Sequence, residues 1–238
     1  MRSILKSFKI FVQQLTSDGM LVMILIAPLL IGVIFKFGIP FLEIQLTNYF
    51  VKDVILGDYY ILFDLLLVIL TPYLICFAAS MTMLDEYDSN IINHLCITPL
   101  GKKGYLFSRL VLPLVLAFII SIVIVSIFSI TSWNIWMIII ISLLTSLLSL
   151  TATLIVFSFS TNKIEGLAIA KLSGLVMMGI VIPFVIIDNA QYYFSFLPSF
   201  WIAKYLITSN LTNFLIALIL ITIWILVLYR RFIRKLSV

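Results

Sequence analysis

The sequence predicts an all-α membrane protein with six transmembrane helices, and three observations support this. Of its 238 residues, 63% are hydrophobic and 11% are charged, and the mean hydropathy is +1.26. Soluble domains usually carry about 45–50% apolar and about 25% charged residues. The chain also contains apolar runs of about 20 residues, the length that a helix needs to cross a bilayer core of about 30 Å. Because lipid offers no hydrogen bonds to the backbone, runs this apolar must be helical.

Six such runs are bounded by charged or turn residues, and together they predict one transmembrane domain over residues 1–238. They extend approximately over Met20–Phe41, Tyr60–Met83, Tyr105–Ile130, Ile135–Phe159, Leu167–Ile187 and Leu211–Tyr229.

Most cations lie in segments that the six spans would place on one side of the membrane. They are Arg2, Lys6, Lys9, Lys102, Lys103, Arg109, Lys163, Lys171, Arg230, Arg231, Arg234 and Lys235. Lys36, Lys52 and Lys204 remain for the other side. Since Lys and Arg concentrate in cytoplasmic loops, we expect a multi-pass protein of the cell membrane with both termini in the cytoplasm. The net charge of +5 is therefore an orientation signal, and no nucleic-acid partner is expected.

The segment 1–19 precedes the first span and is predicted to be an amphipathic interface helix on the cytoplasmic membrane face. Its apolar residues recur at helical spacing, opposite Lys and Gln residues; they are Ile4, Leu5, Phe8, Phe11, Val12 and Leu15. The alternative is that this segment is only a basic start to the chain.

The segment 84–104 connects the second and third spans. It begins with Asp85, Glu86 and Asp88, and acidic residues favour a helix N-terminus. Tyr87, Ile91, Ile92 and Leu95 would then share one face, while Thr98-Pro99 and Gly101 would end the helix. We expect a short cytoplasmic helix that docks in a partner's groove. The alternative is that it packs on the spans of its own chain.

The stretch from Glu86 to Leu100, EYDSNIINHLCITPL, resembles the cytoplasmic coupling segment of type-2 ATP-binding-cassette exporter permeases. The acidic positions, one leucine and the final Thr-Pro-Leu match, whereas Asn90, Ile91 and Asn93 depart from the usual Gly, Thr and Glu. The resemblance implies docking of a separate ATPase subunit through Glu86, Asp88, Ile91, Ile92, Leu95, Thr98 and Pro99.

The same resemblance implies the remaining partners and the activity. ATP and Mg would bind in the ATPase subunit, and a second permease chain, identical or related, would complete the membrane part. The expected function is outward movement of an amphipathic or hydrophobic cargo, such as a drug, a peptide or a lipid-like molecule. Family members also carry a re-entrant hairpin between the last two spans on the outer side. Residues 188–210, rich in aromatic side chains around Pro198, fit that element; the alternative is an aromatic belt at the membrane interface.

Catalytic chemistry is not expected in this chain. It has no G-x-x-x-x-G-K-[ST] phosphate loop, and its one histidine, His94, has no cluster of metal ligands around it. The chain should therefore be a non-catalytic subunit with no cofactor or metal of its own. The alternative function is a secondary transporter without ATP coupling, or a membrane scaffold. Lys36 and Asp64, which could pair near the outer ends of two spans, do not form a convincing proton relay.

Two stripes of small or hydroxyl-bearing residues lie on the fourth and fifth spans. They consist of Ser142, Thr145, Ser146, Ser149 and Thr153, and of Gly166, Ala170 and Gly174. Small residues let helices approach closely in a membrane. These stripes either pack helices together or line a translocation path.

Overall fold

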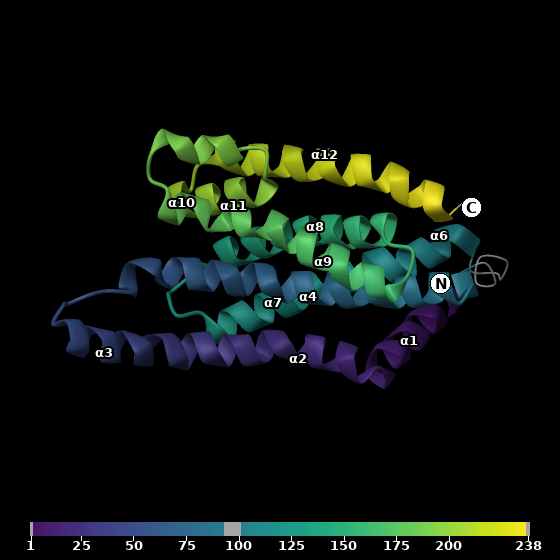
Figure 1. Cartoon of the computed structure of the whole chain (residues 1–238), viewed down its shortest axis with the longest axis horizontal. Coiled ribbons are helices and arrows are strands. Elements are labelled where there is room, and N and C mark those ends of the chain that lie inside the picture. The colour runs from purple at the N-terminus through teal and green to yellow at the C-terminus, as the bar shows by residue number, and fades with distance from the viewer. Residues whose placement is uncertain (1, 93–100, 237–238) are drawn as a thin grey trace.

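The computed structural model describes residues 2–92 and 101–236, and in these ranges every regular element is a helix (Figure 1). The α-helices are α1 (Arg2–Ser17), α2 (Gly19–Val33), α3 (Ile39–Phe50), α4 (Tyr60–Asp88), α6 (Gly101–Leu106), α7 (Leu112–Phe128), α8 (Ile135–Phe159), α9 (Lys163–Met177), α10 (Ile182–Val185), α11 (Pro198–Thr208) and α12 (Leu211–Leu236). Short π- or 3-10-helical segments flank or join some of them: η1 (Ile34–Gly38), η2 (Gly57–Tyr59), η3 (Phe107–Val111), η4 (Met178–Ile180) and η5 (Asn189–Phe194).

Five helical segments of the described chain are long and apolar enough to cross a membrane. They are Gly19–Phe50, Gly57–Asp88, Gly101–Phe128, Ile135–Phe159 and Leu211–Leu236. The predicted fifth span, Leu167–Ile187, is not one continuous helix: α9 ends at Met177 and is followed by η4 and α10. The break has two causes. Pro183 cannot continue the ladder of backbone hydrogen bonds, and the Ser199 hydroxyl of α11 donates to the Val176 carbonyl.

Figure 1 shows how the chain runs back and forth along the long axis of the molecule. Both termini lie at the same end, together with α6, and α3, α10 and α11 lie at the opposite end. The broken segment from α9 to α10 supplies one passage between the two ends. This passage consists of α9, η4 and α10 rather than of one continuous helix.

The core is built on α4 and α8. In their most apolar stretches 61% and 67% of the residues are buried, against 17% in α2–α3 and 11% in α12. Leu65 and Val68 of α4 and Leu144 and Leu148 of α8 are fully buried and belong to one apolar cluster. The flanking helices α2 and α12 turn large apolar side chains outward. Such a surface is suited to lipid rather than water.

The hydroxyl stripe of α8 lies inside this core. All five residues are buried, and most of their hydroxyls donate to carbonyls of α8 itself; the residues are Ser142, Thr145, Ser146, Ser149 and Thr153. Thr153 instead donates to the Cys76 carbonyl of α4 at 3.0 Å. The Thr153 contact therefore joins α8 to α4.

The small residues of α9 form its seam with α4. A Cβ atom on Gly166 would lie 2.4 Å from Leu84 Cδ1, which is closer than side chains can approach. The Ala170 carbonyl accepts a hydrogen bond of 2.8 Å from the Tyr73 hydroxyl, and Gly174 faces the same hydroxyl. The absence of bulk at these positions lets α9 approach α4 closely.

The predicted helix over residues 1–19 is present as α1, which ends at Ser17. The chain itself covers part of the apolar face: Phe11 and Leu15 are buried in a cluster with residues of α4 and with Tyr105. Ile10 and Val12 stay exposed. The expectation that the apolar stripe rests on the membrane is therefore corrected for Phe11 and Leu15, because α4 and α6 offer them a protein surface.

Candidate functional site at the end of the two termini

The last turn of α4 carries the acidic residues that were expected to begin a separate helix. The helix runs without interruption through Asp88 and is capped at Ser89, and Asn90 has a left-handed φ of 58°. The acidic residues thus stand at a helix C-terminus, where the helix dipole disfavours negative charge. The prediction was wrong because cations of other helices compensate this charge.

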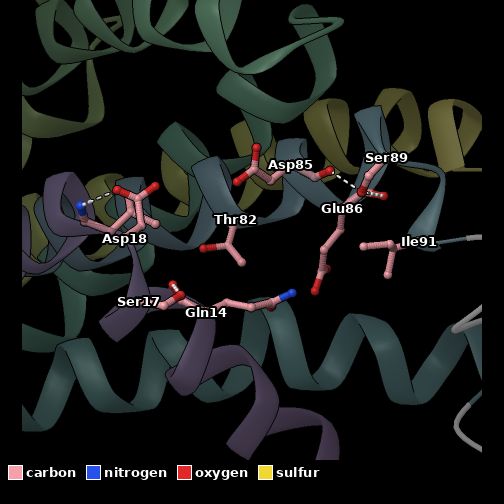
Figure 2. A pocket seen from close by; sticks show the side chains of 9 residues that line it. Gln14, Ser17, Asp18, Thr82, Asp85, Glu86, Ser89 and Ile91 are labelled. Carbon is pink, nitrogen blue, oxygen red and sulfur yellow. Dashed lines mark hydrogen bonds between the residues drawn. The ribbon is translucent and has the colours of Figure 1, made fainter.

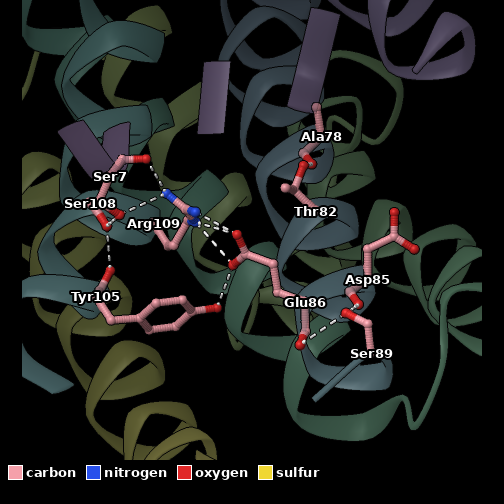
Figure 3. A network of polar contacts seen from close by, with 9 residues as sticks. All are labelled: Ser7, Ala78, Thr82, Asp85, Glu86, Ser89, Tyr105, Ser108 and Arg109. Carbon is pink, nitrogen blue, oxygen red and sulfur yellow. Dashed lines mark hydrogen bonds and ion pairs between the residues drawn. The ribbon is translucent and has the colours of Figure 1, made fainter. Parts of the chain in front are cut away.

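Glu86 and Arg109 form the first of these contacts, a buried ion pair with both side chains 1% exposed (Figure 3). Arg109 lies in η3, and its Nε donates to Oε1 and Oε2 of Glu86 at 3.1 and 3.0 Å. Its Nη2 also donates to Oε1. The Tyr105 hydroxyl of α6 donates to Oε2 at 3.0 Å. The charge of Arg109 and these hydrogen bonds together compensate the Glu86 carboxylate, which would be costly to bury alone.

The same guanidinium reaches α1. Nη1 of Arg109 donates to the Ser7 carbonyl at 2.9 Å and lies 3.3 Å from the Ser7 hydroxyl, as Figure 3 shows. The Phe11 ring lies under the guanidinium, with its centroid 5.0 Å away. Ser108 adds a hydroxyl contact of 3.2 Å to Ser7. One arginine therefore joins α1, the end of α4 and the start of the third membrane passage.

Lys163 makes the second compensating contact at the first residue of α9. Its Nζ lies 2.7 Å from Asp18 Oδ2 and 3.1 Å from Asp85 Oδ2. The Lys163 ammonium and the backbone N–H groups of Met20 and Leu21 hold the pKa of Asp18 below its ordinary value. Burial alone would lower the pKa of Lys163, but the bonds to Asp18 and Asp85 together raise it. This contact ties the starts of α2 and α9 to the end of α4.

A polar cavity of about 480 Å³ lies between the α1–α2 junction and the end of α4 (Figure 2). Its walls are Gln14, Ser17, Asp18, Leu21, Thr82, Asp85, Glu86, Ser89 and Ile91. Gln14 Oε1 is buried there with no hydrogen-bond partner among the described residues. A polar cavity of this size has room for water. Asp18, Asp85 and Glu86, the carboxylates of the two ion-pair groups, therefore line this polar cavity.

Comparison with known proteins gives the family of a chain with this arrangement. A family model described as "Fluoroquinolones export permease protein Rv2686c-like" matches residues 11–232. The chain belongs to this family. Two curated relatives are the fluoroquinolones export permease proteins Rv2686c of Mycobacterium tuberculosis (strain ATCC 25618 / H37Rv) and MT2760 of strain CDC 1551 / Oshkosh. Each is 26% identical over 192 residues, which cover 79% of this chain and 75% of the relative. No solved structure matches.

The family agrees with the resemblance of residues 86–100 to exporter permeases, and it makes this chain a membrane permease of the export type. The structure divides the predicted docking residues of the permease into three groups. Asp88, the last residue of α4, and Ile91, which follows the helix, are exposed. Glu86 and Ile92 are buried within the chain, so their side chains face Arg109 and the apolar core. Leu95, Thr98 and Pro99, like His94, lie outside the described residues.

Arg109, Ser7 and Lys163 were not singled out from the sequence of the permease. Arg109 and Lys163 were counted only as cations that set orientation. A signal for Arg109 was present, since it interrupts the apolar run that begins at Tyr105, and a charge inside such a run needs a partner. Ser7 carried no such signal, because its main contact uses a backbone carbonyl.

Lys36 and Asp64, toward the opposite end of the permease, do not pair with each other. Lys36 donates to the Ile127 carbonyl near the end of α7. Asp64 is buried and accepts from the backbone N–H groups of Ile130 and Thr131 at 2.8 and 2.9 Å and from Trp133 Nε1 at 3.1 Å. The suggestion that Lys36 and Asp64 could pair is therefore wrong. Lys36 binds the end of α7, and Asp64 binds the loop between α7 and α8.

Proposed function

We propose that this permease is the membrane subunit of an ATP-driven exporter, and that the segment after α4 docks a separate ATPase subunit that binds ATP and Mg. Family membership and the resemblance of residues 86–100 support the exporter part. The observation that carries the coupling part is the Glu86–Arg109 ion pair, which joins the end of α4 to α1 and to the third passage. A force applied after Asp88 would reach three elements through that one contact.

Within the described residues, Asp88 and Ile91 are the candidates for direct contact with the ATPase, because both are exposed. Glu86 and Ile92 would act from inside the permease by holding the end of α4 in place. Both termini and the docking segment would then face the cytoplasm.

We further propose that the cargo path forms between two permease chains, identical or related. The hydroxyl stripe of α8 is buried and already hydrogen-bonded to backbone carbonyls. A path through one chain would have to separate α4 from α8, the two most buried helices. A path between two chains avoids this cost. Residues 188–210, which include η5 and α11, would form the re-entrant hairpin on the outer side.

The first cargo to test is a fluoroquinolone, the compound class in the names of the two curated relatives. Such drugs are amphipathic, which agrees with the amphipathic or hydrophobic cargo expected from the sequence. Uptake by inverted vesicles containing the permease and its ATPase should require ATP. Transport that persists after ATP depletion would favour the alternative of a secondary transporter.

Docking is tested at Ile91. Ile91→Asp should abolish co-purification of the ATPase and drug-stimulated ATP hydrolysis, while Ile91→Val should retain both. Because Ile91 is exposed, neither variant should reduce membrane insertion or the melting temperature of the permease. Normal ATPase binding by the Ile91→Asp variant would contradict the proposed docking surface.

A further inference from the structure

An open apolar groove runs between three membrane helices near the end that holds both termini. It has a volume of about 300 Å³, and its lining residues are Leu110, Val111, Leu114, Leu150, Leu154, Ile225, Leu226 and Tyr229. Leu110 of η3 and Leu154 of α8 form a buried floor, and Val111, Leu226 and Tyr229 form exposed rims. The groove therefore opens outward from the bundle, on the surface that would face lipid.

The groove ends at a charged boundary. On α12, Arg230 follows the rim residue Leu226 by four residues and so lies on the same face of the helix. On the other side, Lys103 of α6 precedes Phe107 by one turn, and Phe107 precedes the rim residue Val111 by the single turn of η3. Lys103 and Arg230 are both exposed. Two cations from different helices thus stand at the cytoplasmic mouth of the groove.

The charge around the groove is of one sign. Segments Gly101–Phe128, Ile135–Phe159 and Leu211–Leu236, which form the groove, contain no Asp or Glu. They contain Lys102, Lys103, Arg109, Arg230, Arg231, Arg234 and Lys235. Arg109 is turned inward to Glu86, and the Arg231 guanidinium lies 3.9 Å from the centroid of the Phe159 ring. Lys102 and Arg234 are also exposed, but Lys103 and Arg230 are the exposed cations nearest to the rims along their helices.

We propose that the groove binds one acyl chain of an anionic phospholipid whose phosphate lies between Lys103 and Arg230. An acyl chain matches the apolar lining, and a phosphate matches the two cations at the mouth. In a bilayer, lipid phosphates lie at the level where the apolar surface of the helices ends and basic residues begin. A bound lipid would link α12, whose surface is mainly exposed, to α7 and α8. This inference does not depend on ATP coupling or on the identity of the cargo.

Native mass spectrometry and thermal unfolding of the permease in nanodiscs test the site. Phosphatidylglycerol should bind at one tight site per permease and raise its melting temperature. Phosphatidylcholine with the same acyl chains is the comparison lipid. The variant Lys103→Gln/Arg230→Gln should weaken that binding roughly 25-fold, because each basic residue near an anionic headgroup contributes a factor of about five. The matched control Lys52→Gln/Lys204→Gln makes the same charge change at the opposite end and should bind like the wild type. Equal losses in the two double variants would overturn the site in favour of diffuse charge attraction.

The acyl part is tested separately with Leu226→Trp. Leu226 is 58% exposed, so the larger ring can fill the groove without disturbing the core. We expect the tight phosphatidylglycerol site to be lost although both cations remain. Retention of the site would overturn the groove assignment. A shift of the wild-type melting temperature by soluble glycerol phosphate, equal to that by the lipid, would overturn it as well. A changed oligomeric state in Leu226→Trp would instead show a second permease chain in the groove.

Discussion

The two ends of α4 each bury one carboxylate, and they satisfy it in different ways. Asp64, near the start, accepts from backbone N–H groups and a Trp side chain of the loop that joins α7 to α8. Glu86, near the end, accepts from the guanidinium of Arg109, which also holds α1. Neutral loop donors hold Asp64, whereas a full charge on another element holds Glu86.

This difference separates a local cap from a connection between elements. The Asp64 cap fixes one loop on one helix, so its loss should lower the stability of the permease without affecting coupling. The Glu86–Arg109 pair joins three elements next to the proposed docking segment, so its loss should affect both stability and coupling.

Arg109→Ala should have the largest effect, about 3–5 kcal/mol of unfolding free energy, because it leaves Glu86 charged and buried without a cation. The measurement is reversible unfolding in detergent or nanodiscs. The double variant Glu86→Leu/Arg109→Leu removes both charges and should recover much of the loss. A loss below about 1 kcal/mol for Arg109→Ala would show that the pair is hydrated rather than buried.

Asp64→Ala should cost about 1–3 kcal/mol, since the N–H groups of Ile130 and Thr131 lose their acceptor. The two carboxylates are about 33 Å apart along the helix, at 1.5 Å per residue, so the losses from Asp64→Ala and Arg109→Ala should add within about 0.5 kcal/mol. Drug-stimulated ATPase activity, measured below the melting temperature of each variant, should fall in Arg109→Ala and persist in Asp64→Ala. Equal falls would remove the distinction between the two ends.

Gly166→Ala should cost about 1–3 kcal/mol, because the new Cβ would collide with Leu84 in the seam between α9 and α4. Gly174→Ala is the matched control on the same stripe. Its Cβ would meet the Tyr73 hydroxyl at 3.5 Å, an ordinary contact. We expect no loss of melting temperature in the control, since Ala also favours the helix.

Lys163→Met should have the smallest effect, below about 1 kcal/mol, because the contacts to Asp18 and Asp85 are partly solvated. The contribution of Asp18 is fully present above its ordinary pKa of 3.8 and is lost as the pH falls through the lowered value in the folded state. That of Lys163 is present below 10.5 and is lost as the pH rises through its raised value. The stability difference between wild type and variant should therefore be constant between these limits and shrink outside them. A difference that changes near pH 7 would contradict the assignment.

The sequence by itself determined the helical class, the membrane location and five helical segments that are long and apolar enough to cross a membrane, because these follow from composition and from the length of apolar runs. It also placed the small residues of α9 on one face, since helical periodicity requires it. The tertiary structure decided where the segment Leu167–Ile187 is broken, because the Ser199 hydroxyl reaches the Val176 carbonyl from another helix and adds to the local effect of Pro183. It also decided that Glu86 belongs to the interior. Local rules assigned the acidic residues to a helix N-terminus, but Arg109 and Lys163, distant in sequence, supply the charge that lets them end a helix instead.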